Sequence, residues 1–123
     1  MEKSVCSMLI EKGIPFECQV LLEDNLARME QADGSELVSV DKEFHELLIR
    51  ATENELFSMI MEAVMIVYRE WIDLVLRRVN IKEKANLLNY HKQIYNSVLE
   101  RDEVSMKAAV DGHYHLISQM LAL

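Results

Sequence analysis

The chain has 123 residues, which is the length of a single domain. Hydrophobic residues make up 50% of it and charged residues 28%, a balance that excludes an intrinsically disordered chain. The 21 acidic residues outnumber the 13 basic ones and give a formal net charge of −8, which repels phosphate backbones and argues against nucleic-acid binding by this chain alone.

The first half of the chain is predicted to form three helices. Glycine and proline are rare, at three and one residues, whereas good helix formers such as Leu, Glu and Met abound. A first helix is expected from residue 1 to 12, ended by Gly13. A second begins at Pro15, which suits a first helical turn, and ends near Gln31. Ser35 is expected to cap a third helix that ends near Thr52.

The second half is predicted to form three more helices. A long helix is expected from residue 54 to 79, where it would span about 39 Å at ~1.5 Å per residue. Asn80 is expected to cap a fifth helix that ends near residue 100, and Asp102 to cap a sixth. No internal repeat or linker divides the chain. We therefore predict one all-α domain over residues 1–123, an antiparallel bundle of about six helices.

Polar residues stand within the apolar faces of three predicted helices. On the third helix, Asp41 and His45 are four residues apart and so share one face. His91 and His113 hold the same kind of position on the fifth and sixth helices. The predicted apolar faces are Val38, Asp41, Phe44/His45, Leu48 and Thr52 on the third helix; Ile81, Ala85, Leu88, His91, Ile94/Tyr95 and Val98 on the fifth; and Met106, Ala109/Val110, His113, Ile117 and Met120 on the sixth.

This pattern of three histidines and one aspartate indicates a metal site. Burying so many titratable groups costs several kcal/mol unless they pair with one another or bind a metal ion. An aspartate oxygen and three imidazole nitrogens suit Zn²⁺, Ni²⁺, Mn²⁺ or Cu²⁺. From the residues alone two interpretations stay open, a divalent metal site and a network of hydrogen bonds within a structural bundle.

Other notable side chains are predicted to have structural roles. His115 lies two residues after His113 and therefore points about 200° away around the helix, toward solvent or a subunit contact. Trp71, Tyr68 and Phe57 on the long helix are expected in the core or at an interface.

Four short sequence blocks follow one another in a specific order. They are D-x-x-F-H at residues 41–45, A-x-x-N at 51–54, H-x-x-I at 91–94, and an aspartate, an alanine pair and a histidine between 102 and 113. Over about residues 16–121 these blocks resemble the FCD domain. That domain is the ligand-sensing C-terminal half of FadR-type regulators in the GntR family.

The resemblance implies a metal-dependent sensor. Metal-containing members of the family hold a divalent ion with one aspartate and three histidines, which are carried over here to Asp41, His45, His91 and His113. In the family the ion lies deep in the bundle and anchors a small carboxylate effector. The resemblance further implies that Asn54 contacts the effector or orients a ligand.

Two features depart from the family pattern. Met65 stands at about the place where many members carry an arginine that meets the effector, so the class of effector stays open. The family's regulators also carry a winged-helix DNA-binding domain ahead of this one, and this chain has none. We expect a truncated or free-standing sensor with a shortened first helix, which reaches DNA only through such a domain and forms a homodimer.

We expect the protein in the cytoplasm. Its N-terminus lacks the apolar run of a signal peptide, its two cysteines suggest no disulfide framework, and residues 63–68, the longest apolar stretch, are too few to span a membrane.

We expect no catalysis, because the four candidate ligands leave no clear general base. The alternative functions are a structural dimerisation module and a small metal-dependent hydrolase.

Overall fold

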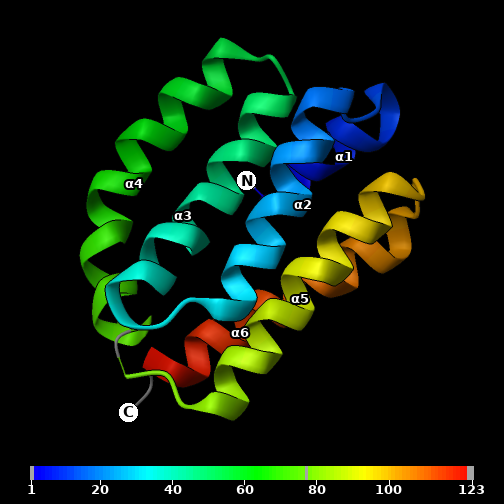
Figure 1. The fold of residues 1–123 in the computed structure, drawn as a ribbon. Coiled ribbons are helices and arrows are strands. Elements are labelled where there is room, and N and C mark those ends of the chain that lie inside the picture. The colour runs from blue at the N-terminus through cyan, green and yellow to red at the C-terminus, as the bar shows by residue number, and fades with distance from the viewer. Residues whose placement is uncertain (1, 77, 122–123) are drawn as a thin grey trace.

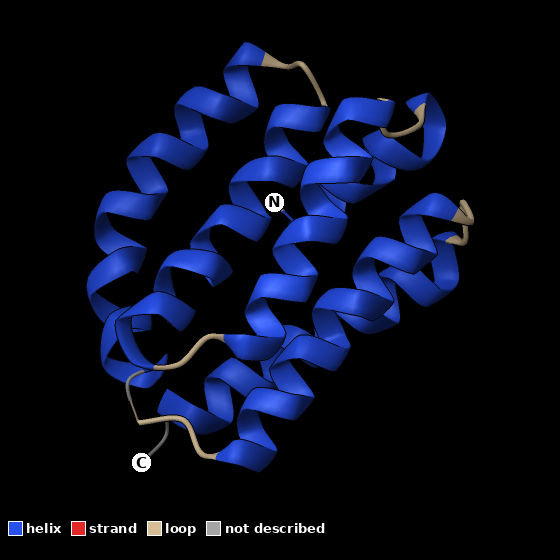
Figure 2. Ribbon diagram, in the orientation of Figure 1, coloured by secondary structure: helices blue, strands red, loops and turns tan. Residues whose placement is uncertain are grey.

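Over the residues that the structure describes, the chain forms six helices, which pack into a bundle (Figure 1). The computed structural model describes residues 2–76 and 78–121, with the backbone alone for residues 67–69 and 121. In chain order the helices are α1 (Glu2–Lys12), α2 (Phe16–Gln31), α3 (Gly34–Ala51), α4 (Glu55–Leu76), α5 (Ile81–Leu99) and α6 (Glu103–Leu121). These bounds confirm the all-α class, and Figure 2 shows helices joined by short loops with no strand in the described ranges.

Several predicted helix ends are confirmed and one cap is wrong. Asn80 caps α5 in a capping box with Glu83, and the carboxylate of Asp102 accepts the backbone N–H of Ser105 at the start of α6. Ser35 does not cap α3, because Asp33 holds the N-cap position. The chain turns through Gly34, whose φ of +58° suits glycine, and the helix therefore starts before the serine.

Two smaller differences concern where helices begin and end. Pro15 lies immediately before α2 in an extended conformation, so Phe16 is the first helical residue. The described part of α4 ends at Leu76 rather than at residue 79, and Arg77 lies outside the described residues.

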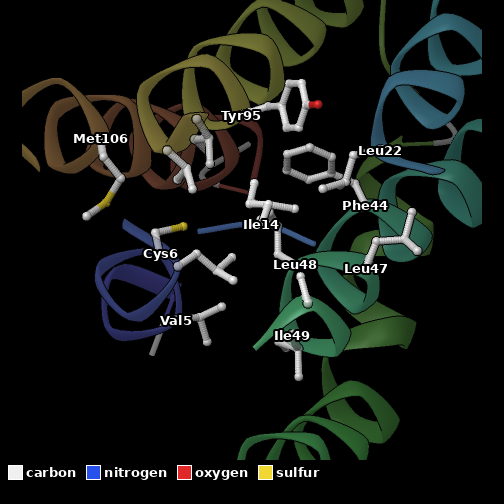
Figure 3. Packing of buried hydrophobic residues seen from close by; sticks show 14 of the residues in the cluster. Val5, Cys6, Ile14, Leu22, Phe44, Leu47, Leu48, Ile49, Tyr95 and Met106 are labelled. Atoms are coloured by element: carbon white, nitrogen blue, oxygen red, sulfur yellow. The ribbon is translucent and has the colours of Figure 1, made fainter. Parts of the chain in front are cut away.

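The hydrophobic core consists of two clusters. The first joins residues of all six helices, Met61 and Met65 of α4 among them, and Figure 3 shows side chains such as Cys6, Phe44 and Leu48 gathered in its interior. The second lies toward the other end of the bundle and contains Leu37 and Leu87. On each of α3, α5 and α6 the chain passes from one cluster to the other, and Asp41, His45, His91 and His113 stand near that boundary.

The predicted apolar face of α5 is wrong at its beginning. Ile81 is 90% exposed and Ala85 is also exposed, whereas Leu87 is fully buried. The buried positions run 87, 91, 94 and 98, so the same helical spacing continues backward to Lys84 rather than to Ala85. The prediction placed the early part of the face one residue too late.

Helix α4 lies at the edge of the bundle, beside α3 (Figure 1). Phe57 is half-buried against the first cluster, whereas Trp71 is exposed and does not reach the core. The Tyr68 side chain lies outside the described residues. Among the described side chains of α4, five apolar ones are 59–72% exposed, and we call them its "outer face": Leu56, Met59, Ile66, Trp71 and Leu74. No described helix is both long enough and apolar enough to cross a membrane.

Candidate metal centre

The structure brings Asp41, His45, His91 and His113 together in the interior. One potential ligand atom from each residue lies within 4.8 Å of the corresponding atom of every other. Asp41 and His45 come from successive turns of α3, His91 from the middle of α5 and His113 from α6. Three helices that meet at the boundary between the two apolar clusters thus supply all four side chains.

A glycine allows α5 and α6 to approach closely beside the histidines. A Cβ atom at Gly112 would clash with Cε1 of Tyr90. Gly112 precedes His113, and Tyr90 precedes His91. The absent side chain therefore leaves room for the tyrosine ring at the point where the two helices present their histidines.

The facing atoms of the four residues are three Nε2 nitrogens and one carboxylate oxygen. Oδ1 of Asp41 lies 3.1 Å from Nε2 of His91 and 3.6 Å from Nε2 of His45. Nε2 of His91 and Nε2 of His113 lie 3.2 Å apart. A carboxylate oxygen and imidazole nitrogens that converge in this way are suitable ligands for a borderline divalent ion.

Burial of these groups leaves polar atoms unsatisfied. The four residues are between 0% and 6% exposed. Oδ1 of Asp41 and Nε2 of His45 have no hydrogen-bond partner, although both belong to the converging set. Buried polar atoms in native proteins are nearly always paired, so a pure hydrogen-bond network explains this cluster poorly. An ion shared by the four residues would satisfy both atoms, and the donor set fits one.

Glu2 is a component of this site that sequence reasoning missed. Nδ1 of His45 donates a hydrogen bond to Oε1 of Glu2 over 3.0 Å, and Glu2 is only 3% exposed. This contact leaves Nε2 of His45 as the nitrogen that faces Asp41. An acidic residue at the start of a helix ordinarily indicates a favourable interaction with the helix dipole at the surface. The available signal was the spacing of Glu2, Cys6 and Leu9, which places the acid on the buried face of α1.

The electrostatic environment separates the three histidines into two kinds. Burial opposes the charged form of His45, but Glu2 and then Asp41 outweigh it and raise the pKa of His45 to about 10. Burial lowers the pKa of His91, and it lowers the pKa of His113 well below the ordinary value. Although burial alone would raise it, the pKa of Asp41 is lowered by contacts with His45 and His91. Without an ion, one imidazolium therefore lies between two carboxylates.

A cavity adjoins the cluster. It has a volume of about 250 Å³ and lies between α1, α3, α4 and α6. Burial, together with the charges of Glu2 and Cys6, raises the pKa of Tyr114 to about 12, so its hydroxyl stays protonated at neutral pH. The lining consists of two candidate ligands and five other residues: Glu2, His45, Met61, Val64, Met65, His113 and Tyr114.

A second, more open groove of about 470 Å³ runs between α3 and α4. It carries the basic side chains of Lys42 and Arg50. Met61 and Met65 line both spaces and stand between the groove and the cavity.

The remaining predicted site residues lie elsewhere. Asn54 lines neither space, and its side-chain oxygen accepts the backbone N–H groups of Leu56 and Phe57 at the start of α4. It therefore acts as a helix cap. His115 is exposed, as its position on the helix predicts, and takes no part in the cluster.

Comparison with known proteins identifies one family. The family model of the FCD domain matches residues 2–116, which is nearly the whole chain. No curated protein and no solved structure matches the chain significantly.

Proposed function

We propose, from the premise that this chain belongs to the FCD domain family, that it senses a small carboxylate through a bound divalent ion. FCD domains are the effector-binding halves of GntR-type transcriptional regulators. The ion would be Zn²⁺, Ni²⁺, Mn²⁺ or Cu²⁺, the metals that accept this mixed nitrogen and oxygen donor set. A carboxylate effector bound there would report to a winged-helix domain carried by the same regulator.

The observation that carries this proposal is the convergence of four buried donor atoms beside a cavity. Asp41, His45, His91 and His113 would hold the ion. Bound there, the ion supplies positive charge and open coordination positions for carboxylate oxygens. The chain has a net charge of −8 and would otherwise attract an anion poorly.

Residues around the ligands have supporting roles. Glu2 fixes the orientation of His45 through the hydrogen bond at Nδ1, as outer carboxylates do for histidine ligands in general. His45 and His113 border the cavity, so an acid that enters it meets the metal centre directly. Met61 and Met65 provide apolar walls that limit water around the bound acid.

Metal analysis and thermal shift test the proposal together. Protein purified without a nickel column should contain about one divalent ion per chain. Small mono- and dicarboxylic acids are then screened for those that raise the melting temperature. At least one acid should stabilise the metal-loaded protein and leave His91→Ala unaffected. Fully folded protein that contains no metal would contradict the proposal. An acid whose stabilising effect persists after metal removal would also contradict it.

The same metal analysis separates the alternatives. A structural dimerisation module would contain no metal, and its melting temperature would not respond to acids. A hydrolase would turn over ester or amide substrates when loaded with metal.

Asn54 is proposed as a second contact to the effector. Asn54→Asp keeps an oxygen that can cap α4 but removes the amide donor. If Asn54 donates a hydrogen bond to the acid, this variant should keep its stability and lose affinity for the acid. An unchanged affinity would assign Asn54 to the helix cap alone.

We also propose a homodimer that uses the outer face of α4, because isolated apolar side chains are common on surfaces but a series along one helix favours a partner. Sedimentation of the wild type should show a dimer, and Trp71→Gln should raise the dissociation constant of that dimer.

The isolated chain should not bind DNA specifically. A mobility shift at nanomolar protein and physiological salt that a single base change abolishes would overturn that expectation.

A further inference from the structure

The cavity beside the metal centre has an unusual charge pattern for a site that takes an acid. Its lining contains one carboxylate, that of Glu2, and among its described residues neither lysine nor arginine. Met65 is one of the apolar residues in that lining. The basic side chains of Lys42 and Arg50 line the neighbouring groove. They lie on the other side of Met61 and Met65 and do not line the cavity.

The buried charges at the site already balance a divalent ion. Asp41 and Glu2 are two carboxylates, each at most 3% exposed, and the ligand histidines are neutral when they bind a metal. One further carboxylate on the ion leaves a single excess negative charge. A second carboxylate on the same molecule would lie in the cavity near Glu2 without a basic partner, and the two like charges would repel each other.

The shape of the cavity leads to the same conclusion about the ligand. Its volume of about 250 Å³ is below the ~300–1,000 Å³ that is usual for small-molecule sites, so the ligand is compact. Met61, Val64 and Met65 present hydrocarbon and thioether surface to it. These side chains suit the apolar tail of a short acid and offer no hydrogen bond to a second acid group.

We propose that the cavity selects short monocarboxylates over dicarboxylates of the same length and that Glu2 is the residue that determines this specificity. The inference rests on the proposed function, since the first carboxylate binds at the metal centre. Glu2 then has two effects, the orientation of His45 from one carboxylate oxygen and the exclusion of a second negative charge from the cavity.

Butanoate and butanedioate are the matched probes, because they share a four-carbon chain and differ by one carboxylate. Their affinities are measured by calorimetry on metal-loaded wild-type protein with its metal content determined in parallel. Butanoate should bind at least about tenfold more tightly, the order expected from one like-charge contact.

Two variants on α1 identify the residue responsible. In Glu2→Gln the preference for butanoate should fall to about threefold or less, because the amide keeps a hydrogen-bond acceptor for His45 but carries no charge. Glu11→Gln removes the same charge from an exposed position of the same helix and should keep the wild-type preference.

Each outcome has a separate meaning. Equal affinity for the two acids in the wild type, or a preference for butanedioate, overturns the selectivity while leaving the metal-dependent function intact. A preference that Glu2→Gln retains overturns the role of Glu2. Metal-loaded protein that binds neither acid overturns the selectivity for butanoate and the carboxylate site together, and protein that contains no metal overturns the proposed function at its first step.

Discussion

The interior cluster and the outer face of α4 both depart from the usual burial of apolar side chains and exposure of polar ones. The cluster buries polar groups, and the outer face exposes apolar side chains. Inside, four titratable residues are at most 6% exposed, whereas outside, five large apolar side chains are at least 59% exposed. The interior arrangement costs several kcal/mol without a partner, and its donor atoms converge on one point. Exposed apolar side chains are common on protein surfaces and select no particular chemistry. Buried polar groups therefore specify a ligand, whereas an exposed apolar face indicates at most a partner.

The largest expected effect separates a buried histidine of α5 from an exposed histidine of α6. His91→Ala should remove nearly all bound metal, because losing a ligand should exceed the ~10–100-fold cost of losing an outer partner. His115→Ala, at an exposed position of α6, should leave the metal content unchanged. Metal analysis of both proteins gives the answer, and equal metal in the two would disprove the assignment of ligands.

Removing the metal should destabilise the fold. A ligand that binds only the native state contributes about 2.7 kcal/mol when present at a hundredfold excess over its Kd. Chelation at pH 7.5 should therefore lower the melting temperature by roughly 10 °C. The effect should shrink toward pH 5, where protons compete for the histidines. A melting curve unchanged in protein shown to have lost its metal would count against the interior site.

The close approach of α5 and α6 offers a test of the interior geometry. Gly112→Ala places a methyl group against the Tyr90 ring and should lower the free energy of unfolding by about 1 kcal/mol. In a Tyr90→Ala background the same change should stabilise by about 1 kcal/mol, because alanine is the better helix former. Denaturant titrations of the four proteins complete the double-mutant cycle. Additive effects would show that the ring does not limit the helix approach.

The pKa of His45 predicts a proton linked to metal binding. Since the pKa is raised to about 10, the metal-free protein carries an imidazolium at pH 7.5 and must release its proton to the solvent when the ion binds. Affinity should rise about tenfold per pH unit between pH 7 and 9. In the metal-free protein the same group stabilises the fold fully below about pH 6.5, and that stabilisation is lost as the pH rises toward 10.

Calorimetry in two buffers of different ionisation enthalpy counts the released proton. Glu2→Gln should reduce the count at pH 7.5, because Glu2 is the strongest of the charges that hold the proton. Metal binding without proton release from the wild type would contradict the buried imidazolium.

The smallest effect is expected on the outer face of α4. Met59→Gln and Leu74→Gln should each change the free energy of unfolding by no more than about 0.5 kcal/mol at concentrations where the chain is monomeric. The same variants should weaken the proposed dimer in sedimentation experiments. A loss of several kcal/mol from the monomer would show that these side chains belong to the core.

The sequence predicted those parts of the structure that depend on local spacing. The six helices follow from periodicity and caps, and Asp41 and His45 share a face because they are four residues apart. The same helical spacing predicts that His91 and His113 are buried. It fails at Ile81, because the buried face of α5 drifts by one position over two turns. Serine favours the N-cap position, so the sequence predicts Ser35 there, whereas the turn at Gly34 sets the actual start of α3 and Asp33 is the N-cap.

Other features depend on how distant helices pack. Glu2 reaches His45 across 43 residues of sequence, and the spacing on α1 predicts that Glu2 is buried but not which residue it contacts. The cavity exists because α4 and α6 both approach that contact, which again needs tertiary structure. The role of Gly112 becomes visible only beside Tyr90, since an isolated glycine in a helix otherwise indicates a weak point.

The sequence separation of the site residues has a consequence for hydrogen exchange. The cluster joins α3, α5 and α6, and its contacts close a loop of 43 residues between Glu2 and His45 and still longer loops from Asp41 to His91 and His113. Such loops gain nothing from local order, so the complete site exists only when the whole bundle is folded. With an ion in place, the backbone amides of these three helices should exchange through one shared global opening rather than by separate fraying. The metal centre thus makes the unfolding of neighbouring helices a single cooperative event.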